Sequence, residues 1–285
     1  MSASVFTLTG FADEIDDNFV TQLQGLSSLN IRFIEIRGVN GKNISTLSPP
    51  EIREVQNRLE EYGIRVSSIG SPIGKITLQD DFGVHLDMAK RIFETARTLN
   101  SPFVRIFSFY IPQGSDAALY RNEVMERIGA ILEAAKGSGL TILHENEKEI
   151  YGDNPERCLD LMETFGSPHF ACAFDPANFV QCGSEAYPAA YEMLKPYIKY
   201  VHIKDALAED GRNVPAGMGA GRIEEVLQDL KANGYNGFLS LEPHLGSFTG
   251  LHELEHASLP DTLEASGLHS FRLAHSSLLQ ILNRI

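Results

Sequence analysis

The sequence predicts an α/β fold, namely a (β/α)8 TIM barrel that forms a single domain over residues 1–285. Three observations support this prediction. Strand-like and helix-like runs alternate along the chain, which implies parallel strands joined by right-handed crossovers. The alternation yields eight units, and eight is the number that closes a barrel. The length of 285 residues is ordinary for one barrel with a sizeable core.

The expected strands are short runs of mostly apolar residues, several with a polar residue at every second position near the end. In such a run successive side chains point to opposite faces, so one face meets the barrel interior and the other meets the helices. The expected strands cover residues 6–9, 31–36, 65–69, 103–107, 141–145, 170–175, 198–204 and 238–242.

The expected helices lie between these strands and show capping signals or apolar residues at three- and four-residue steps. Ser48 is an N-cap signal because two prolines follow it, and Gly63 is a stop signal for the same helix. Asn154 and Pro155 open a later helix in the same way. The expected helices cover about residues 17–29, 49–62, 84–99, 116–136, 155–165, 186–194, 222–233 and 269–282.

An open, doubly wound sheet is the alternative architecture for this alternation. The first turn argues against a dinucleotide-binding sheet, because Gly10-Phe11-Ala12-Asp13 lacks the glycine spacing of such a site. A closed barrel therefore remains the preferred prediction.

Composition and charge limit the classes of function. The net charge is −14, from 24 basic and 38 acidic side chains, which argues against nucleic acid as a partner. The N-terminus has neither a basic nor an apolar leader region, and we see no apolar run that could span a bilayer. The three cysteines, Cys158, Cys172 and Cys182, have no metal-like spacing and are expected to be reduced. These features predict a cytoplasmic protein without a membrane partner.

Four successive expected strands end in potential metal ligands. Glu145, Asp175, His202 and Glu242 each lie at or near the last residue of their strand. Alternation assigns all four to the inward face, together with residues such as Leu143, Ala171, Ala173, Tyr200 and Ser240. The C-terminal rim of a barrel is where this fold places chemistry. The sequence therefore predicts one divalent metal site at the ends of the last four strands.

Three carboxylates and one imidazole are a mostly hard-oxygen ligand set. Such a set favours Mn²⁺, Mg²⁺ or Co²⁺, with Zn²⁺ possible. An octahedral ion with four protein ligands keeps two open positions, which fit two adjacent oxygens of a polyhydroxy carbonyl compound. A small-molecule carbohydrate is therefore the expected substrate.

Four motifs make the chain resemble the sugar phosphate isomerase/epimerase superfamily of xylose-isomerase-like TIM barrels. They are His144-Glu145-Asn146-Glu147, Phe174-Asp175-Pro176-Ala177-Asn178, His202-Ile203-Lys204-Asp205 and Leu241-Glu242-Pro243-His244. The resemblance implies that Glu145, Asp175, His202 and Glu242 bind the metal and that the two glutamates are also the acid/base residues. Many members have histidine where this chain has Glu147 and Asn178, so contacts to substrate hydroxyls differ here.

The expected activity is metal-dependent isomerisation or epimerisation of a ketose or sugar-phosphate-like substrate, by proton transfer through an enediolate. The alternative enzyme is a metal-dependent dehydratase of a keto-polyol such as inosose or 3-dehydroshikimate. The non-enzyme alternative is a sugar-binding barrel. A homo-oligomer is possible in each case. Candidate substrate-binding residues on the same rim are Lys204, His244, Glu147, Asn178, Arg105, Lys75 and Phe109.

Two further motifs have alternative interpretations. The glycine-rich loop 217–221 precedes a helix and suits either a phosphate site or a plain tight turn, and we favour the turn. Residues 252–256 match the metalloprotease pattern H-E-x-x-H, but Pro260 interrupts the segment soon afterwards. We therefore do not expect protease activity.

Overall fold

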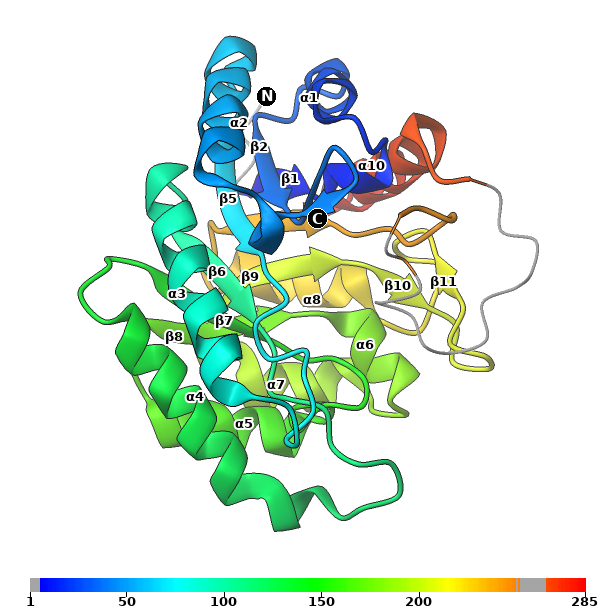
Figure 1. Ribbon diagram of the computed structural model, residues 1–285. Coiled ribbons are helices and arrows are strands. Elements are labelled where there is room, and N and C mark those ends of the chain that lie inside the picture. Colours follow the sequence, from blue (N-terminus) through cyan, green and yellow to red (C-terminus); the bar gives the residue numbers. More distant parts are fainter. Residues whose placement is uncertain (1–5, 250, 252–264) are drawn as a thin grey trace.

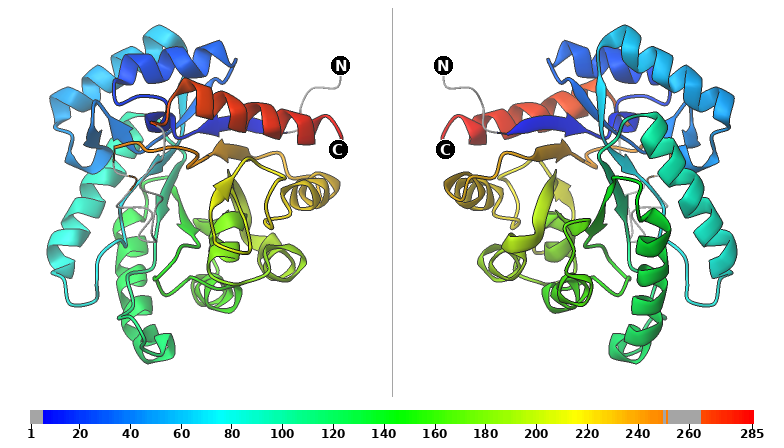
Figure 2. Two further views of the ribbon diagram at one scale, coloured as in Figure 1. Left: turned by 90° about the vertical axis from the view of Figure 1, so that its right-hand side faces the viewer. Right: turned by 90° about the vertical axis from the view of Figure 1, so that its left-hand side faces the viewer.

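The computed structural model describes residues 6–249, 251 and 265–285. Within them, eight parallel strands form a nearly closed barrel with helices on its outside (Figures 1 and 2). The hydrogen-bonded order of the strands is β1-β12-β9-β8-β7-β6-β5-β2. The strands are β1 (Thr7–Gly10), β2 (Phe33–Ile36), β5 (Arg65–Gly70), β6 (Phe103–Ile106), β7 (Thr141–Glu145), β8 (Phe170–Phe174), β9 (Ile198–Ile203) and β12 (Phe238–Leu241). The predicted TIM barrel is confirmed.

The barrel has a seam between β1 and β2. In the described part of the chain these two strands share no continuous ladder, and a single parallel bridge joins Phe11 to Glu35. Both residues lie at the C-terminal end of the barrel, so the seam is closed there by backbone and side-chain contacts rather than by a full strand pair.

The outer helices follow the predicted order. They are α1 (Phe19–Ser28), α2 (Pro49–Tyr62), α3 (Phe82–Thr98), α4 (Arg121–Ala135), α5 (Pro155–Phe165), α7 (Tyr191–Leu194), α8 (Ile223–Ala232) and α10 (Leu268–Leu282). Ser48 and Glu51 form the capping box of α2, and Gly63 ends that helix in the left-handed conformation. Helix α10, red in Figure 1, packs against α8 and β12 and runs alongside the first barrel strand (Figure 2).

Two predicted helices differ in detail from the structure. The range 116–136 is a 3₁₀ turn, Ala117–Tyr120, which Asp116 caps, followed by α4 from Arg121 to Ala135. The range 186–194 is a π-type turn, Ala186–Ala190, with an extended residue at Tyr187, and only α7 is α-helical. A proline at position 188 explains this break, since proline cannot continue a regular helix.

Several short elements at the C-terminal rim were not predicted. Helix α6 (Pro176–Gln181) follows β8 directly, and two small hairpins are formed by β3 (Gly38–Val39) with β4 (Lys42–Asn43) and by β10 (Asp205–Ala206) with β11 (Asn213–Val214). They are too short to give a periodic pattern. They matter because they build the loops around the strand ends.

The N-terminal half of the barrel interior is filled by an apolar plug. Leu143, Ala171, Ala173 and Tyr200 form it, and the rings of Phe103 and Phe238 pack against it. The ring centroid of Tyr200 lies 5.9 Å from that of Phe103 and 5.7 Å from that of Phe238. The outward residues of β8, Phe170, Cys172 and Phe174, belong to the separate core beneath the helices. The predicted inward and outward faces are thus confirmed.

Candidate metal centre

Each of the four predicted metal ligands sits at the C-terminal end of a barrel strand. Glu145 is the last residue of β7, and His202 is the penultimate residue of β9. Asp175 and Glu242 come directly after β8 and β12. Asp175 also caps α6, since its Oδ1 accepts a hydrogen bond from the Asn178 backbone N–H at 2.9 Å. The cap leaves Oδ2 of Asp175 turned toward the other ligands.

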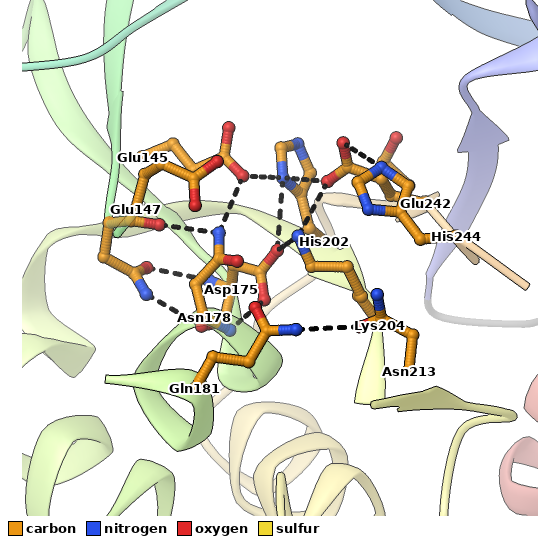
Figure 3. A network of polar contacts seen from close by, with 12 residues as sticks. Glu145, Glu147, Asp175, Asn178, Gln181, His202, Lys204, Asn213, Glu242 and His244 are labelled. Atoms are coloured by element: carbon orange, nitrogen blue, oxygen red, sulfur yellow. Dashed lines mark hydrogen bonds and ion pairs between the residues drawn. The ribbon is translucent and has the colours of Figure 1, made fainter. Parts of the chain in front are cut away.

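The four side chains meet at one point inside the rim (Figure 3). One ligand atom from each lies within 4.8 Å of the others. His202 Nδ1 is 2.9 Å from Glu145 Oε1, 3.3 Å from Glu242 Oε2 and 4.0 Å from Asp175 Oδ2. All four residues are buried, with at most 3% of any residue exposed. The sequence prediction that these strand ends converge is therefore matched by the geometry.

The chemistry of the cluster fits a divalent cation. Glu145 Oε2, Asp175 Oδ2 and Glu242 Oε2 are buried oxygens that accept no hydrogen bond within the described ranges. Negative charges held this close together are costly unless cations compensate them, and Arg105 and Lys204 already supply part of that compensation. Three carboxylate oxygens and one imidazole nitrogen also match the donors that Mg²⁺, Mn²⁺ or Zn²⁺ accept.

Glu35 orients the imidazole of the cluster. His202 Nε2 lies 3.2 Å from Glu35 Oε2, and the Ser240 hydroxyl donates to the same oxygen at 2.7 Å. A histidine that donates one ring N–H to a carboxylate presents its other nitrogen to a metal, and the carboxylate raises its basicity. The pair therefore leaves Nδ1 of His202 facing the three ligand carboxylates.

Burial and charge shift the pKa values of the cluster in different directions. Burial raises the pKa of Asp175 to about 6, although Lys204 opposes the shift. Burial also disfavours the Glu242 carboxylate, but Lys204, His202 and His244 outweigh it and hold that pKa well below its ordinary value. Burial disfavours the His202 imidazolium, yet Glu145 and Glu35 hold its pKa well above the ordinary value. A bound cation would take the place of the His202 proton.

Three cations hold the carboxylates of the cluster. Arg105 Nη1 lies 3.0 Å from Glu145 Oε2, and Lys204 Nζ lies 3.0 Å from Asp175 Oδ2 and 3.7 Å from Glu242 Oε2. Arg37 Nη1 lies 3.0 Å from Glu242 Oε1. Each acidic ligand thus has its own cation, and this limits the charge repulsion among them.

The other predicted rim residues fall into two groups. His244, Asn178, Glu147 and Lys75 surround the cluster: His244 Nε2 is 3.3 Å from Glu242 Oε1, and Asn178 Nδ2 donates to Glu145 Oε1 at 3.4 Å. Lys75 Nζ lies 3.4 Å from Glu147 Oε2. Four of the seven substrate-binding candidates, Arg105, Lys204, His244 and Asn178, therefore contact a ligand, and Lys75 and Glu147 pair with each other.

Phe109 is not brought to the cluster. Its ring is fully buried and packs against Phe82 and His85, with centroids 6.0 and 6.3 Å away. This places it in the layer between the loop after β6 and helix α3. Its predicted contact with substrate stays untested.

The glycine-rich loop 217–221 has its backbone donors occupied. Asp205 Oδ2 accepts from the N–H groups of Gly217 and Gly219 at 2.8 and 3.0 Å, and Oδ1 accepts from Gly221 at 2.8 Å. A side-chain carboxylate therefore fills the anion-binding concavity that such a loop forms. This geometry agrees with a structural turn rather than a phosphate site.

Sequence reasoning did not assign site roles to Glu14, Glu35 and Arg37. Glu35 and Arg37 share one face of the second strand and its extension, and this spacing at a strand end was the available signal. Glu14 gave no periodic signal, because it lies in the 3₁₀ turn Ala12–Glu14 after β1. Its carboxylate accepts from the His244 backbone N–H at 2.8 Å, and burial raises its pKa to about 7. The H-E-x-x-H segment, 252–256, lies outside the described residues.

The chain belongs to the family of xylose isomerase-like TIM barrels, whose model matches residues 23–262. A curated relative is 2-epi-5-epi-valiolone 7-phosphate 2-epimerase of Actinoplanes sp., which is 23% identical over 197 residues, or 69% of this chain and 71% of that protein. Members of the family act on small carbohydrate substrates as epimerases and isomerases.

Solved structures share the fold at low identity. The IOLI protein with a zinc atom superposes with a TM-score of 0.76, at 16% identity over 98% of this chain and 99% of that chain. The probable 3-DHS dehydratase AsbF of Bacillus anthracis has a TM-score of 0.72, at 17% identity over 96% of this chain and 98% of that chain. The superpositions establish the shared fold. At such low sequence identity they leave the reaction to be argued from the site.

Among the helices described, none has the length and apolar character needed to cross a membrane.

Proposed function

We propose that the protein is a divalent-metal-dependent isomerase or epimerase that acts on a ketose or sugar-phosphate-like substrate by proton transfer through an enediolate. The observation that carries this proposal is the buried cluster of Glu145, Asp175, His202 and Glu242, with one ligand atom of each within 4.8 Å of the others. Three of its oxygens accept no hydrogen bond from the residues described. Three buried carboxylates that converge with one imidazole supply the donor atoms that a divalent cation needs.

A divalent ion held there would stabilise the negative charge that develops on a substrate carbonyl oxygen when the neighbouring proton leaves. The chain supplies the groups that move the proton. Glu145 and Glu242 come from β7 and β12, which are separated in the sheet by β8 and β9. Figure 3 shows them on either side of His202. One glutamate removes the proton, and the other returns a proton to the opposite face, which inverts the carbon.

The outcome depends on where the proton returns. Return to the same carbon from the other face gives epimerisation, and return to the adjacent carbon gives aldose–ketose isomerisation. We propose that Lys204, His244, Glu147, Asn178, Arg105 and Lys75 select between these outcomes by contacting substrate oxygens. Phe109, buried beneath the loop after β6, would act only through packing.

Dehydration of a keto-polyol is the second candidate. The first step is the same proton removal, after which a β-hydroxyl leaves. Lys204 supports this candidate, because its ammonium lies within 4 Å of both Asp175 and Glu242 and could donate a proton to a departing oxygen. A sugar-binding barrel without chemistry would use neither glutamate as a base.

Solvent exchange distinguishes the three candidates. The protein is stripped with chelator, reloaded with Mn²⁺, Mg²⁺, Co²⁺ or Zn²⁺, and incubated in D₂O with free and phosphorylated ketoses and with keto-polyols such as an inosose and 3-dehydroshikimate. Deuterium at the carbon next to the carbonyl, lost in Glu145→Gln and Glu242→Gln, supports the isomerase or epimerase. A new absorbance from an unsaturated ketone supports the dehydratase. Binding of sugars with neither change across the panel would refute both enzyme proposals.

Cytoplasmic location and homo-oligomer formation remain proposals from the sequence. Light scattering coupled to gel filtration measures the oligomer directly, and fractionation of cells that express the chain measures its location.

A further inference from the structure

Arg37 contacts more than one carboxylate, unlike the arginine of a simple surface ion pair. Its guanidinium binds Asp13 through two bonds, Nε to Oδ2 at 2.8 Å and Nη2 to Oδ1 at 3.1 Å. The remaining nitrogen, Nη1, lies 3.0 Å from Glu242 Oε1. The rings of Phe11 and Phe248 lie 4.4 and 5.0 Å from its central carbon. Carboxylates therefore hold the edges of the guanidinium group, and two aromatic rings pack against it.

This contact crosses the seam of the barrel. Asp13 lies in the turn after β1, and Arg37 directly follows β2. These are the two strands that share no continuous ladder in the part of the chain described here. A Cβ at Gly38 would lie 2.9 Å from Asp13 Oδ2, so only glycine lets the aspartate approach the end of β2 this closely. The ion pair thus joins the two strand ends where backbone pairing is sparse.

Because Arg37 contacts only one oxygen of Glu242, the two oxygens of this carboxylate have different neighbours. Oε1 lies 3.0 Å from Arg37 Nη1 and 3.3 Å from His244 Nε2. Oε2 lies 3.3 Å from His202 Nδ1 and 3.7 Å from Lys204 Nζ, on the side of the other ligands. Without Arg37, only His244 would contact the outer oxygen, and the carboxylate plane could turn about the last side-chain bond so that neither oxygen keeps its direction toward the other ligands.

We propose that Arg37, held by Asp13 across the β1/β2 seam, is a positioning residue that fixes Glu242 with Oε2 toward the metal and Oε1 turned away from it. The inference rests on the proposed function, because it takes Glu242 as a metal ligand and proton-transfer group. Arginine is required because a planar fork can bind Asp13 with two nitrogens and Glu242 with a third, whereas the single nitrogen of lysine cannot.

Metal titration of stripped protein tests the proposal without relying on turnover. Arg37→Met is compared with wild type for Mn²⁺ affinity by calorimetry. We expect a loss of about tenfold to a hundredfold, the range found when a group that orients a metal ligand is removed. Asp13→Asn keeps the arginine but weakens its anchor, so a smaller loss in the same direction is expected. Arg37→Lys should not restore the wild-type affinity.

A matched control is available on the surface. Arg121 binds Asp160 with the same two-bond fork, at 2.8 and 2.6 Å, and joins α4 to α5 away from the cluster. Arg121→Met should leave Mn²⁺ affinity at the wild-type value. Hydrogen exchange at residues 11–14 and 33–36 should rise in Arg37→Met and stay unchanged in the control, because only Arg37 spans the seam.

The kinetic readout separates positioning from folding. If Arg37 orients Glu242, Arg37→Met lowers kcat of ketose exchange more than it raises KM. Unchanged Mn²⁺ affinity in Arg37→Met, or full rescue by Arg37→Lys, would overturn the proposal. If Arg37→Met does not fold, Asp13→Asn and Arg37→Lys decide by the same titration. Wild-type protein that binds Mn²⁺ but exchanges no ketose proton refutes the proposed function, and the titration still tests Arg37.

Discussion

The two ends of the barrel interior are built from the same strands but hold opposite kinds of side chain. At the N-terminal end, Phe33, Phe103 and Phe238 are the first residues of their strands; Phe103 and Phe238 pack against Tyr200, and Phe33 packs against Phe238. At the C-terminal end the buried carboxylates are those of Glu14, Glu35, Glu145, Glu147, Asp175, Asp205 and Glu242, and the buried cations are Arg37, Arg105 and Lys204, with Asp13 and Lys75 half-buried beside them. One end consists of apolar contacts, and the other consists of compensated charge.

The two ends of the sheet therefore have different roles: the apolar end stabilises the fold, and the charged end carries the chemistry. Burial of apolar rings stabilises the fold at about 25 cal/mol per Å². Burial of charges costs free energy unless each has a partner, so the rim depends on its ion pairs and on a cation. Changes at the rim should therefore affect metal and activity first, and changes in the plug should affect stability first.

The largest effect is expected from the two acid/base residues. Glu145→Gln or Glu242→Gln removes a proton-transfer group and a metal ligand together, so exchange should fall by about 10³-fold or more. Each variant also removes the charged partner of a buried arginine, Arg105 or Arg37, so its unfolding free energy is measured beside the rate. Deuterium incorporation measures the rate. Glu149→Gln, an exposed acid on the same loop, serves as the control and should leave exchange unaltered.

The second-largest effect is expected at the N-terminal end of the barrel interior, in the apolar plug. Leu143 is fully buried in the plug, two residues before Glu145. Leu143→Ala should lower the unfolding free energy by about 3 kcal/mol, because it removes apolar contacts and leaves a cavity. Denaturant titration measures this, with the exposed Leu119→Ala as a near-neutral control. A large change in Mn²⁺ affinity would show that the two ends are not independent.

Removing the metal should lower the stability of the folded protein through the rim alone. With Mn²⁺ at a hundred times its dissociation constant, the folded state should gain about 2.7 kcal/mol relative to stripped protein. The gain comes from the ligand cluster alone, so it should vanish in His202→Ala and persist in Leu143→Ala. Thermal unfolding with and without chelator measures it. Equal melting temperatures for both forms of the wild type would argue against a metal site.

The smallest of these effects is the pH dependence of metal binding. Burial raises the pKa of Asp175 to about 6, so in the metal-free protein a proton competes with the cation below that pH. Protonation of Asp175 alone should lower Mn²⁺ affinity by up to about tenfold for each pH unit below 6, and the proton on His202 adds to this loss. The proton on His202, whose pKa is raised, should make affinity continue to rise above pH 6. Calorimetry between pH 5 and 7.5 measures this, and a flat profile would contradict it.

The same shift has the opposite sign for stability without metal. The folded state holds the Asp175 proton more tightly than the unfolded chain, whose aspartate pKa is about 3.9. The contribution of Asp175 to stability therefore falls as pH rises from about 4 to about 6. A bound cation reverses this trend, because it favours the ionised carboxylate.

Local patterns account for the parts that were predicted well. All eight barrel strands were predicted, and the inward face of β8 follows from alternation alone. Capping residues placed the ends of α2 and α5. The segment 186–194 was predicted less well, because Pro188 interrupts its helical pattern and leaves only Tyr191–Leu194 as an α-helix.

By itself the sequence determined the barrel, its inward faces and the four strand ends that carry Glu145, Asp175, His202 and Glu242, because each depends on residues close together in the chain. Only the tertiary structure decided which charges compensate them. Arg37 meets Glu242 across 205 residues, and Glu35 meets His202 across 167. Closing the barrel brings β2 opposite β9 and beside the end of β12, and no local pattern specifies which distant strands will face each other across its interior.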